Sequence, residues 1–251
     1  VATTRAVLDS DHAARILDAT TRLEAQGFHS ASGVAQPTSI ADHPRFDDIV
    51  AAVPRVSRAG TYDSQAIDAA MAAIESGRAD RILDAADTLA SSGFTARNTV
   101  ERLAAIAGDP QFDEIVAAVP RVSRAGTYGF EAIDASRNAV RSGHGARILD
   151  AADALADKGF TATNAVESLT SIAADPRFDE IVAAVPRVAR TGTYSFESIA
   201  AARDAVRSGH ADRILAAADS LAAEGFTSPN GVDGLTKLSS TPEFDAIVSL
   251  V

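Results

Sequence analysis

A 66-residue repeat constrains the fold of this chain more than any other feature. The stretch FDDIVAAVPRVSRAGTY at 46–62 returns almost unchanged at 112–128 and 178–194, and a shortened copy occupies 244–251. Repeats of this kind are supersecondary units that bury their apolar faces by stacking on their neighbours. The 251 residues therefore indicate one repeat array rather than unrelated domains.

A glycine column shows that each 66-residue unit consists of two related halves. Glycine recurs with a 33-residue period, at Gly27, Gly60, Gly93, Gly126, Gly159, Gly192 and Gly225. A glycine directly after an apolar helical pattern is typical of a helix that ends in the left-handed conformation. We therefore assign a structural role to Gly60, Gly93, Gly126, Gly159 and Gly192.

A second column, with the same period, predicts where a helix begins. It consists of Ser10, His43, Ser76, Asp109, Ser142, Asp175, Ser208 and Thr241. All but the histidine are residue types whose side chains cap helix N-termini by accepting a backbone N–H. In alternate halves a proline follows directly, as at Pro110 and Pro176, which suits the first position of a helix.

Each half reads as a hairpin of two helices, called here the first helix and the second helix. Apolar residues at helical spacing predict second helices over 110–124 and 79–91, and first helices over 98–107 and 130–141. Strict strand alternation is absent, so we expect no sheet.

These observations predict an all-α fold, a right-handed superhelical α-solenoid of about eight hairpins in one continuous array. The expected units are 1–27, 28–60, 61–93, 94–126, 127–159, 160–192, 193–225 and 226–251. The sequence begins part-way through a first helix at 3–8 and stops part-way through a second helix at Val251. We expect such ends to expose apolar core that end-to-end stacking would cover.

Three prolines fall inside the second helix of alternate hairpins: Pro54, Pro120 and Pro186. Each removes one backbone hydrogen bond and predicts a bend that wraps the helix around its neighbour, with a functional hinge as the alternative. All aromatic residues recur in repeat register, and we interpret these stripes as core.

The residues that support catalysis or metal binding do not form a recognisable pattern. The chain has no cysteine, its five histidines show no metal-ligand spacing, and its glycines are isolated rather than grouped in a phosphate-binding loop. Carboxylate pairs such as Asp113 and Glu114 recur in first helical turns, where the helix dipole favours them. We expect no enzyme, no metal and no cofactor.

Two arginine columns lie in the last turn of the proline-containing helices, where cations suit the helix dipole. They are Arg55, Arg121 and Arg187, and Arg58, Arg124 and Arg190. One interpretation is that they pair with carboxylates of the next layer. The alternative is a ladder of cations for an acidic partner.

A third candidate column lies two residues after the capping position and varies between copies. It reads His12, Arg45, Arg78, Gln111, His144, Arg177, His210 and Glu243. Positive charge is mildly unfavourable at a helix N-terminus, so these side chains are either solvated loop tips or contacts for a periodic ligand. Arg45, Arg78, His144, Arg177 and His210 are the candidates for such contacts.

The junctions Ser76-Gly77-Arg78, Ser142-Gly143-His144 and Ser208-Gly209-His210 combine a cap, a glycine and a basic residue. With the closing glycine column and the 33-residue period, they resemble the repeats of TAL-effector-like DNA-binding proteins. In that family the interhelix loop reads bases and the second helix holds phosphates, so the resemblance implies nucleic acid as a partner. The chain lacks the family's double-glycine loop, and no base-reading residue is assigned.

A non-enzymatic scaffold that binds a protein partner, or assembles end to end into a filament, fits these features best. Near-identical copies suit avidity and length more than a unique active site. The alternative is nucleic-acid or polyanion binding along a basic edge, which the net charge of −11 disfavours. No apolar run approaches the roughly 18 residues of a membrane span. We expect a soluble protein, and the lack of cysteine and of an initiator methionine is compatible with export or a cell-surface location.

Overall fold

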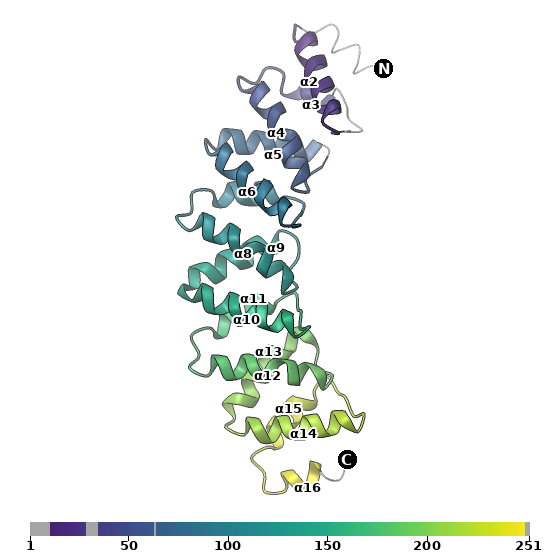
Figure 1. Ribbon diagram of the computed structural model, residues 1–251, viewed down its shortest axis with the longest axis vertical. Helices are drawn as coiled ribbons and strands as arrows, with labels where there is room; N and C mark the ends of the chain where they lie inside the picture. The colour runs from purple at the N-terminus through teal and green to yellow at the C-terminus, as the bar shows by residue number, and fades with distance from the viewer. Residues whose placement is uncertain (1–10, 29–34, 63, 249–251) are drawn as a thin grey trace. The chain divides into compact units, whose positions relative to one another are not determined.

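The computed structural model describes residues 11–28, 35–62 and 64–248, and every regular element among them is a helix (Figure 1). The all-α prediction is therefore confirmed for this part of the chain. The expected helix at 3–8, the capping residue Ser10 and the final Val251 lie outside the described residues.

The second helices all begin at the same position of the repeat. They are α2 (Ala13–Ala25), α4 (Phe46–Arg58), α6 (Ala79–Ser91), α8 (Phe112–Arg124), α10 (Gly145–Asp157), α12 (Phe178–Arg190), α14 (Ala211–Ala223) and α16 (Phe244–Val248). All but the last have 13 residues. The prediction over 79–91 is confirmed, whereas the helix expected over 110–124 begins two residues later, at Phe112.

The first helices alternate between a short and a long form. They are α3 (Ala35–Ser39), α5 (Ser64–Glu75), α7 (Thr99–Ile106), α9 (Glu131–Ala139), α11 (Ala165–Ile172), α13 (Ser195–Arg207) and α15 (Gly231–Leu238). A π-helical turn over Val140–His144 extends α9 toward α10. This alternation is one physical reason why the sequence repeats in pairs of hairpins rather than in single hairpins.

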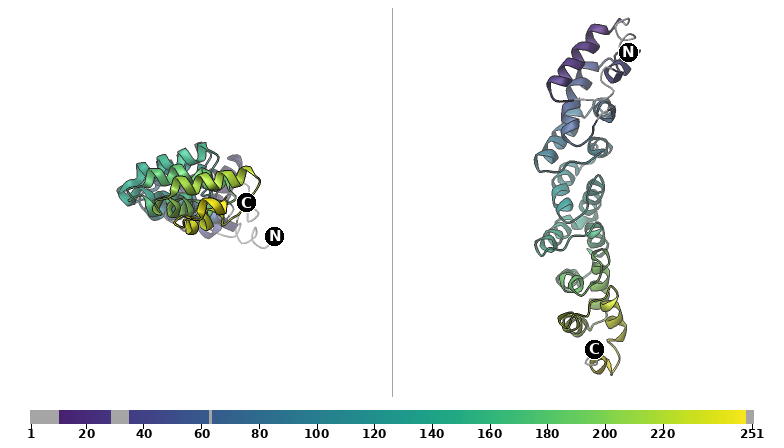
Figure 2. Two further views of the ribbon diagram at one scale, coloured as in Figure 1. Left: turned by 90° about the horizontal axis from the view of Figure 1, so that it is seen from below. Right: turned by 90° about the vertical axis from the view of Figure 1, so that its right-hand side faces the viewer.

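The helices group into two compact units, Val1–Pro120 with Gly129–Ile133, and Arg121–Tyr128 with Asp134–Val251. Within the first unit, α4 packs on α2, α5 and α6, and α5 packs on α7. Within the second unit, α12 packs on α10, α13 and α14, and α13 packs on α11 and α15. Inside each unit, successive hairpins therefore pack on one another, and the views in Figure 2 likewise show helices packed against helices.

The core is built from the same positions of each second helix. Phe46, Phe112, Phe178 and Phe244 open their helices and are at most 1% exposed. Ile49, Ile115 and Ile181 lie three residues further on and are fully buried. Burial of one such side chain stabilises the fold by roughly 1.5–3 kcal/mol, so a stripe repeated along the chain holds the stacked hairpins together.

The interpretation of all aromatic stripes as core is wrong for the tyrosines. Tyr62, Tyr128 and Tyr194 are 64%, 65% and 55% exposed. Each stands two residues after a helix-ending glycine, in a connection whose preceding threonine is buried instead. Phe196 and Phe226 are also more than half exposed, whereas Phe94 and Phe160 are buried as expected.

The glycine column ends the second helices as predicted. Gly159 has φ of +77°, its N–H donates to the carbonyl of Ala156, and the N–H of Phe160 donates to the carbonyl of Leu155. This pair of bonds is the Schellman motif, which satisfies carbonyls at the end of α10. Every glycine of the column has positive φ.

Three members of that column also touch the hairpin that follows. A Cβ on Gly126 would stand 2.8 Å from the backbone nitrogen of Ala162, whose N–H donates to the carbonyl of Ala125. A Cβ on Gly60 would stand 2.7 Å from the backbone nitrogen of Ala96, and a Cβ on Gly192 would stand 2.9 Å from that of Ser228. A Cβ on Gly27, Gly93, Gly159 or Gly225 would meet nothing within 4 Å.

The capping column works as predicted, but one turn before the regular helix. The side chains of His43, Ser76, Asp109, Ser142, Asp175 and Ser208 each accept the backbone N–H two residues on, at 2.8–3.1 Å. The capped residues form a tight turn, and the α-helix begins after it. Pro110 and Pro176 lie in that turn rather than in the helix. Pro54, Pro120 and Pro186 do lie inside α4, α8 and α12, and the bend expected of them stays a prediction.

Candidate functional site

An arginine near the start of alternate second helices fixes the next second helix, an arrangement called here the arginine clasp. The Arg147 guanidinium in α10 lies 4.4 Å from the ring centroid of Phe178 in α12. It donates to the carbonyl oxygen of Ala173 at 3.0 Å and to the carboxylate of Asp179 at 3.2 Å. One planar cation thus covers a core ring, satisfies the carbonyl at the end of α11 and pairs with an acid at the start of α12.

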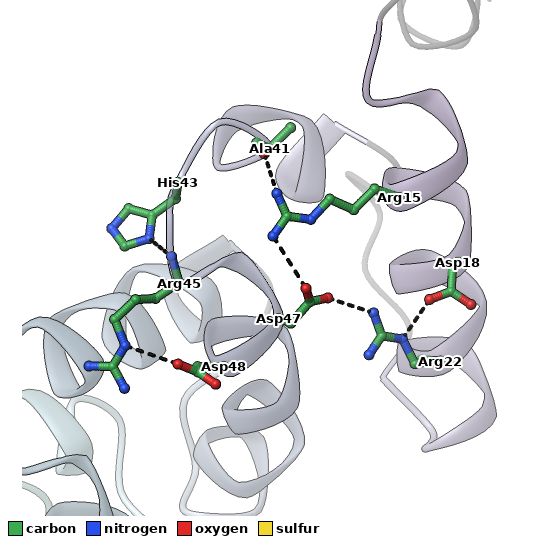
Figure 3. A network of polar contacts seen from close by, with 8 residues as sticks. All are labelled: Arg15, Asp18, Arg22, Ala41, His43, Arg45, Asp47 and Asp48. Carbon is green, nitrogen blue, oxygen red and sulfur yellow. Dashed lines mark hydrogen bonds and ion pairs between the residues drawn. The ribbon is translucent and has the colours of Figure 1, made fainter.

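The clasp recurs once in each pair of hairpins, at Arg15, Arg81, Arg147 and Arg213. Figure 3 shows the first copy, in which Arg15 lies between the Ala41 carbonyl and the Asp47 carboxylate. Hydrogen bonds from Arg22 and Arg15 lower the pKa of the Asp47 carboxyl. The sequence interpretation missed this column. The signal that could have found it is the recurrence of arginine at one fixed distance before each buried phenylalanine.

The two predicted arginine columns at helix ends form the seams between the other pairs of second helices. Arg55 in α4 donates to Asp84 at 2.6 Å and to Asp87 at 2.7 Å, both in α6, and Arg58 donates to Asp87 at 3.1 Å. In the next copy Arg121 donates to Asp150 and Asp153, and Arg124 pairs with Asp157. These arginines therefore do contact carboxylates of the next layer, and a role in binding an acidic partner stays a prediction.

Burial and hydrogen bonding act in opposite directions on these guanidinium groups. Burial lowers the pKa of Arg55, but its hydrogen bonds to Asp84 and Asp87 outweigh that effect, so the net shift is upward. The pKa of Arg121 is raised in the same way by Asp150 and Asp153. Both groups stay charged, as arginine does in proteins, and neither has the depressed pKa that a proton-transfer group needs.

The third copy of this seam differs from the other two. In α12, Arg187 donates from both Nε and Nη2 to the same carboxylate oxygen of Asp219, at 2.9 and 2.6 Å. Ala216 stands where the earlier copies have Asp84 and Asp150, and Ala223 stands where the second has Asp157. Arg190 makes no hydrogen bond or ion pair within the part of the chain that the structure describes.

The variable junction column separates into two groups. Arg45 and Arg177 donate to the carbonyl oxygens of Ile74 and Val206, at the end of the following first helix, and each also pairs with a carboxylate three residues on. Arg78, His144 and His210 are exposed, and their side chains make no hydrogen bond with any described residue. The first group therefore belongs to the seams. The Arg78 guanidinium lies against Gly108, where a Cβ would stand 3.1 Å from its Nη1, whereas His144 and His210 remain available for contacts.

Two grooves bring candidate residues together. The first unit has a groove of about 610 Å³, and its charged lining residues are Arg45, Asp48, Arg55, Arg78, Asp80 and Arg81. In the second unit a groove of about 570 Å³ collects Lys158, Arg187 and Arg190, with no acidic residue in its lining. The two grooves are similar in size and both have more cations than anions in their linings, but only the first contains acidic residues.

No cluster of three or more histidines or carboxylates suited to a metal ion occurs among the described residues. None of the described helices is both long and apolar enough to cross a membrane. Comparison with known proteins finds no match for this chain among protein-family models, curated proteins or solved structures.

Proposed function

We propose that this protein is a non-enzymatic interaction scaffold, an α-solenoid of helical hairpins whose repeated surface binds a protein partner. The observation that carries the proposal is the exposure of Tyr62, Tyr128 and Tyr194 at equivalent positions of three copies. A right-handed superhelix is the form we propose for the array, and both self-assembly and a different protein remain candidate partnerships.

The tyrosines stand out because they are exposed at repeated positions, although the ring of Tyr194 stacks on that of Phe196 with 5.7 Å between centroids. The repeated phenylalanines at helix starts are buried, and the repeated arginines largely close seams between hairpins. The tyrosine rings of 55–65% exposure neither pack in the core nor contribute to those seams. Tyrosine offers a large, rigid contact area with a polar end, and it is enriched at protein interfaces and their hot spots.

Repetition of one weak contact also fits a scaffold better than an enzyme. A partner that engages two equivalent tyrosines gains the second contact at high effective concentration. An active site needs one constellation of unlike groups, whereas the aspartates and arginines of the described seams are engaged with one another. The same pairing makes a continuous polyanion-binding edge the weaker candidate, because it neutralises most of the predicted cations.

The test compares the wild-type chain with two triple variants at positions 62, 128 and 194. One variant replaces the tyrosines by serine, and the other replaces them by phenylalanine, which keeps the ring. Sedimentation velocity over a concentration series measures self-association, and affinity capture from a native extract measures other protein partners. Circular dichroism checks that helical content is unchanged.

We expect the wild type and the phenylalanine variant to self-associate or to retain a defined protein, and the serine variant to lose that interaction. Two results together would contradict the proposal. The wild-type chain would stay monomeric at all concentrations, and the wild type and the serine variant would capture the same proteins.

A further inference from the structure

The basic groove of the second unit has an excess of unpaired positive charge. It lies where the α10–α11 connection meets α12 and the start of α13, and Lys158, Arg187 and Arg190 line it. Lys158 and Arg190 are exposed and contact no carboxylate among the described residues. Asp219 pairs with Arg187, and Asp157, next to Lys158 in the chain, pairs with Arg124.

This charge arises from substitutions specific to the third copy. In the first copy, Arg55 and Arg58 face Asp84 and Asp87, so the charges balance. In the second, Arg121 and Arg124 face three aspartates. In the third, alanines at 216 and 223 replace two of those acids, and Lys158 stands where the second copy has Ser92 and the first has Gln26. Three cations therefore line the groove, and only Arg187 among them pairs with a carboxylate, that of Asp219.

A buried hydroxyl at the same groove lacks a partner. Thr193 lines the groove and is only 6% exposed, and its Oγ1 has no hydrogen bond in the structure. The equivalent Thr127 donates from its hydroxyl to the carbonyl of Thr163 at 2.8 Å, whereas the hydroxyl of Thr61 in the first copy lacks a partner as Thr193 does. A buried polar atom without a partner is unfavourable, and a ligand oxygen at this position would supply the missing hydrogen bond.

We propose that this groove binds a small phosphorylated ligand, up to the size of a nucleotide. Arginine forks and lysine ammonium groups are the side chains that recognise phosphate oxygens, and the hydroxyls of Thr161 and Ser195 add neutral donors. The groove volume of about 570 Å³ lies within the range of small-molecule sites. The net charge of −11 opposes a long polyanion more than it opposes a compact ligand with a few charges.

Isothermal titration calorimetry with the full chain at low ionic strength tests the proposal, with pyrophosphate and ATP as probes. The first variant combines Lys158→Ser and Arg190→Ser, which change two exposed side chains. The second combines Ala216→Asp and Ala223→Asp, which restore the acids of the other copies at exposed positions of α14. We expect each double variant to weaken pyrophosphate binding about tenfold or more, because charge-assisted hydrogen bonds are lost or competed away.

Two controls separate local recognition from general charge. Ala72→Asp combined with Ala105→Asp adds the same charge at exposed positions of α5 and α7 in the first unit, and we expect it to leave binding unchanged. Arg58→Ser in the first copy removes an exposed cation from the first unit and should also have no effect. The proposal is overturned if neither probe binds, if the groove variants bind as wild type does, or if the remote aspartates weaken binding equally. Binding of a single-stranded oligonucleotide without binding of either small probe would overturn the small-ligand assignment in favour of nucleic acid.

Discussion

Two glycines of the second unit test whether the hairpins are joined by close backbone contact. Gly126 and Gly159 both end a 13-residue helix, and both have positive φ, at +108° and +77°. They differ in what a side chain would meet, because a Cβ on Gly126 would press on the backbone of Ala162, whereas one on Gly159 would meet open space. Alanine at each position therefore compares a glycine that has a close backbone neighbour with one that has none.

The size of each effect follows from these contacts. An alanine in the left-handed region costs roughly 1–2 kcal/mol. This conformational cost is larger for Gly126→Ala, because φ of +108° lies further from the left-handed minimum than +77° does. Gly126→Ala also places Cβ 2.8 Å from the Ala162 nitrogen and 3.0 Å from its carbonyl carbon and oxygen, atoms that belong to backbone and cannot rotate away. Overpacking of this kind costs about 1–3 kcal/mol. The lower entropy of the unfolded alanine chain offsets about 0.4–1 kcal/mol in both variants and cancels in the comparison.

We expect Gly126→Ala to lower the free energy of unfolding by about 1–3 kcal/mol more than Gly159→Ala does. Urea unfolding followed by circular dichroism measures the difference, and equal m-values would show that the same cooperative unit unfolds in both variants. Equal destabilisation by the two alanines would refute the reasoning, because it would mean that the loop of the following hairpin does not press on Gly126 in solution.

Two further predictions concern single side chains. Arg147→Lys should lower the free energy of unfolding by about 1–2 kcal/mol, because an ammonium group cannot cover Phe178 and also reach Ala173 and Asp179. Urea unfolding measures this change. As a control, Arg190→Lys at an unpaired position should change the free energy of unfolding little. The backbone N–H of Arg177 and then the side chain of Arg207 lower the pKa of the Asp175 carboxyl, so its contribution to stability is present above the unfolded-state pKa and is lost as pH falls through the lower folded-state pKa. The stability difference between wild type and Asp175→Asn should therefore shrink below about pH 4, and a difference that stays constant with pH would contradict this assignment.

The helices were predictable because their signals are local. The glycine column marks helix ends by backbone conformation alone, and the spacing of residues such as Phe112 and Ile115 marks one buried face. Helix starts were placed less well, because the capping residues Asp109 and Asp175 act on a turn that precedes the regular helix. The sequence shows that a cap is present but not how many residues of turn follow it.

The candidate site was less predictable because its residues depend on contacts between hairpins. Periodicity shows that Tyr62 and Tyr128 are equivalent, but not which side of the connection faces solvent. To predict the arginine clasp, one must know where a phenylalanine ring of the next second helix lies, and no local sequence pattern gives that position. Differences between copies also became interpretable only with the structure. Asp84 and Asp150 pair with the equivalent arginines of the first two copies, so Ala216 marks the loss of one such ion pair in the third.

The pairing of hairpins in the sequence follows from an alternation of two seams, and this alternation can be tested by deletion. Second helices α6 and α10 use the clasp of Arg81 and Arg147, whereas α4 and α8 use the paired arginines that begin at Arg55 and Arg121. Deletion of 112–177 joins α7 to α12, and it gives Arg81 a phenylalanine and an aspartate in the expected register. Deletion of 112–144 joins α7 to α10, so that Arg81 meets Gly145 and Ala146 instead.

We therefore expect the chain that lacks 112–177 to unfold cooperatively with a denaturation midpoint near that of the wild type and a proportionately smaller m-value. The chain that lacks only 112–144 should be less stable although it is longer, because it loses a buried phenylalanine and leaves a guanidinium without its partners. Equal midpoints for the two deletions would show that any hairpin can follow any other. The seams would then not be the reason why the sequence repeats in pairs of hairpins.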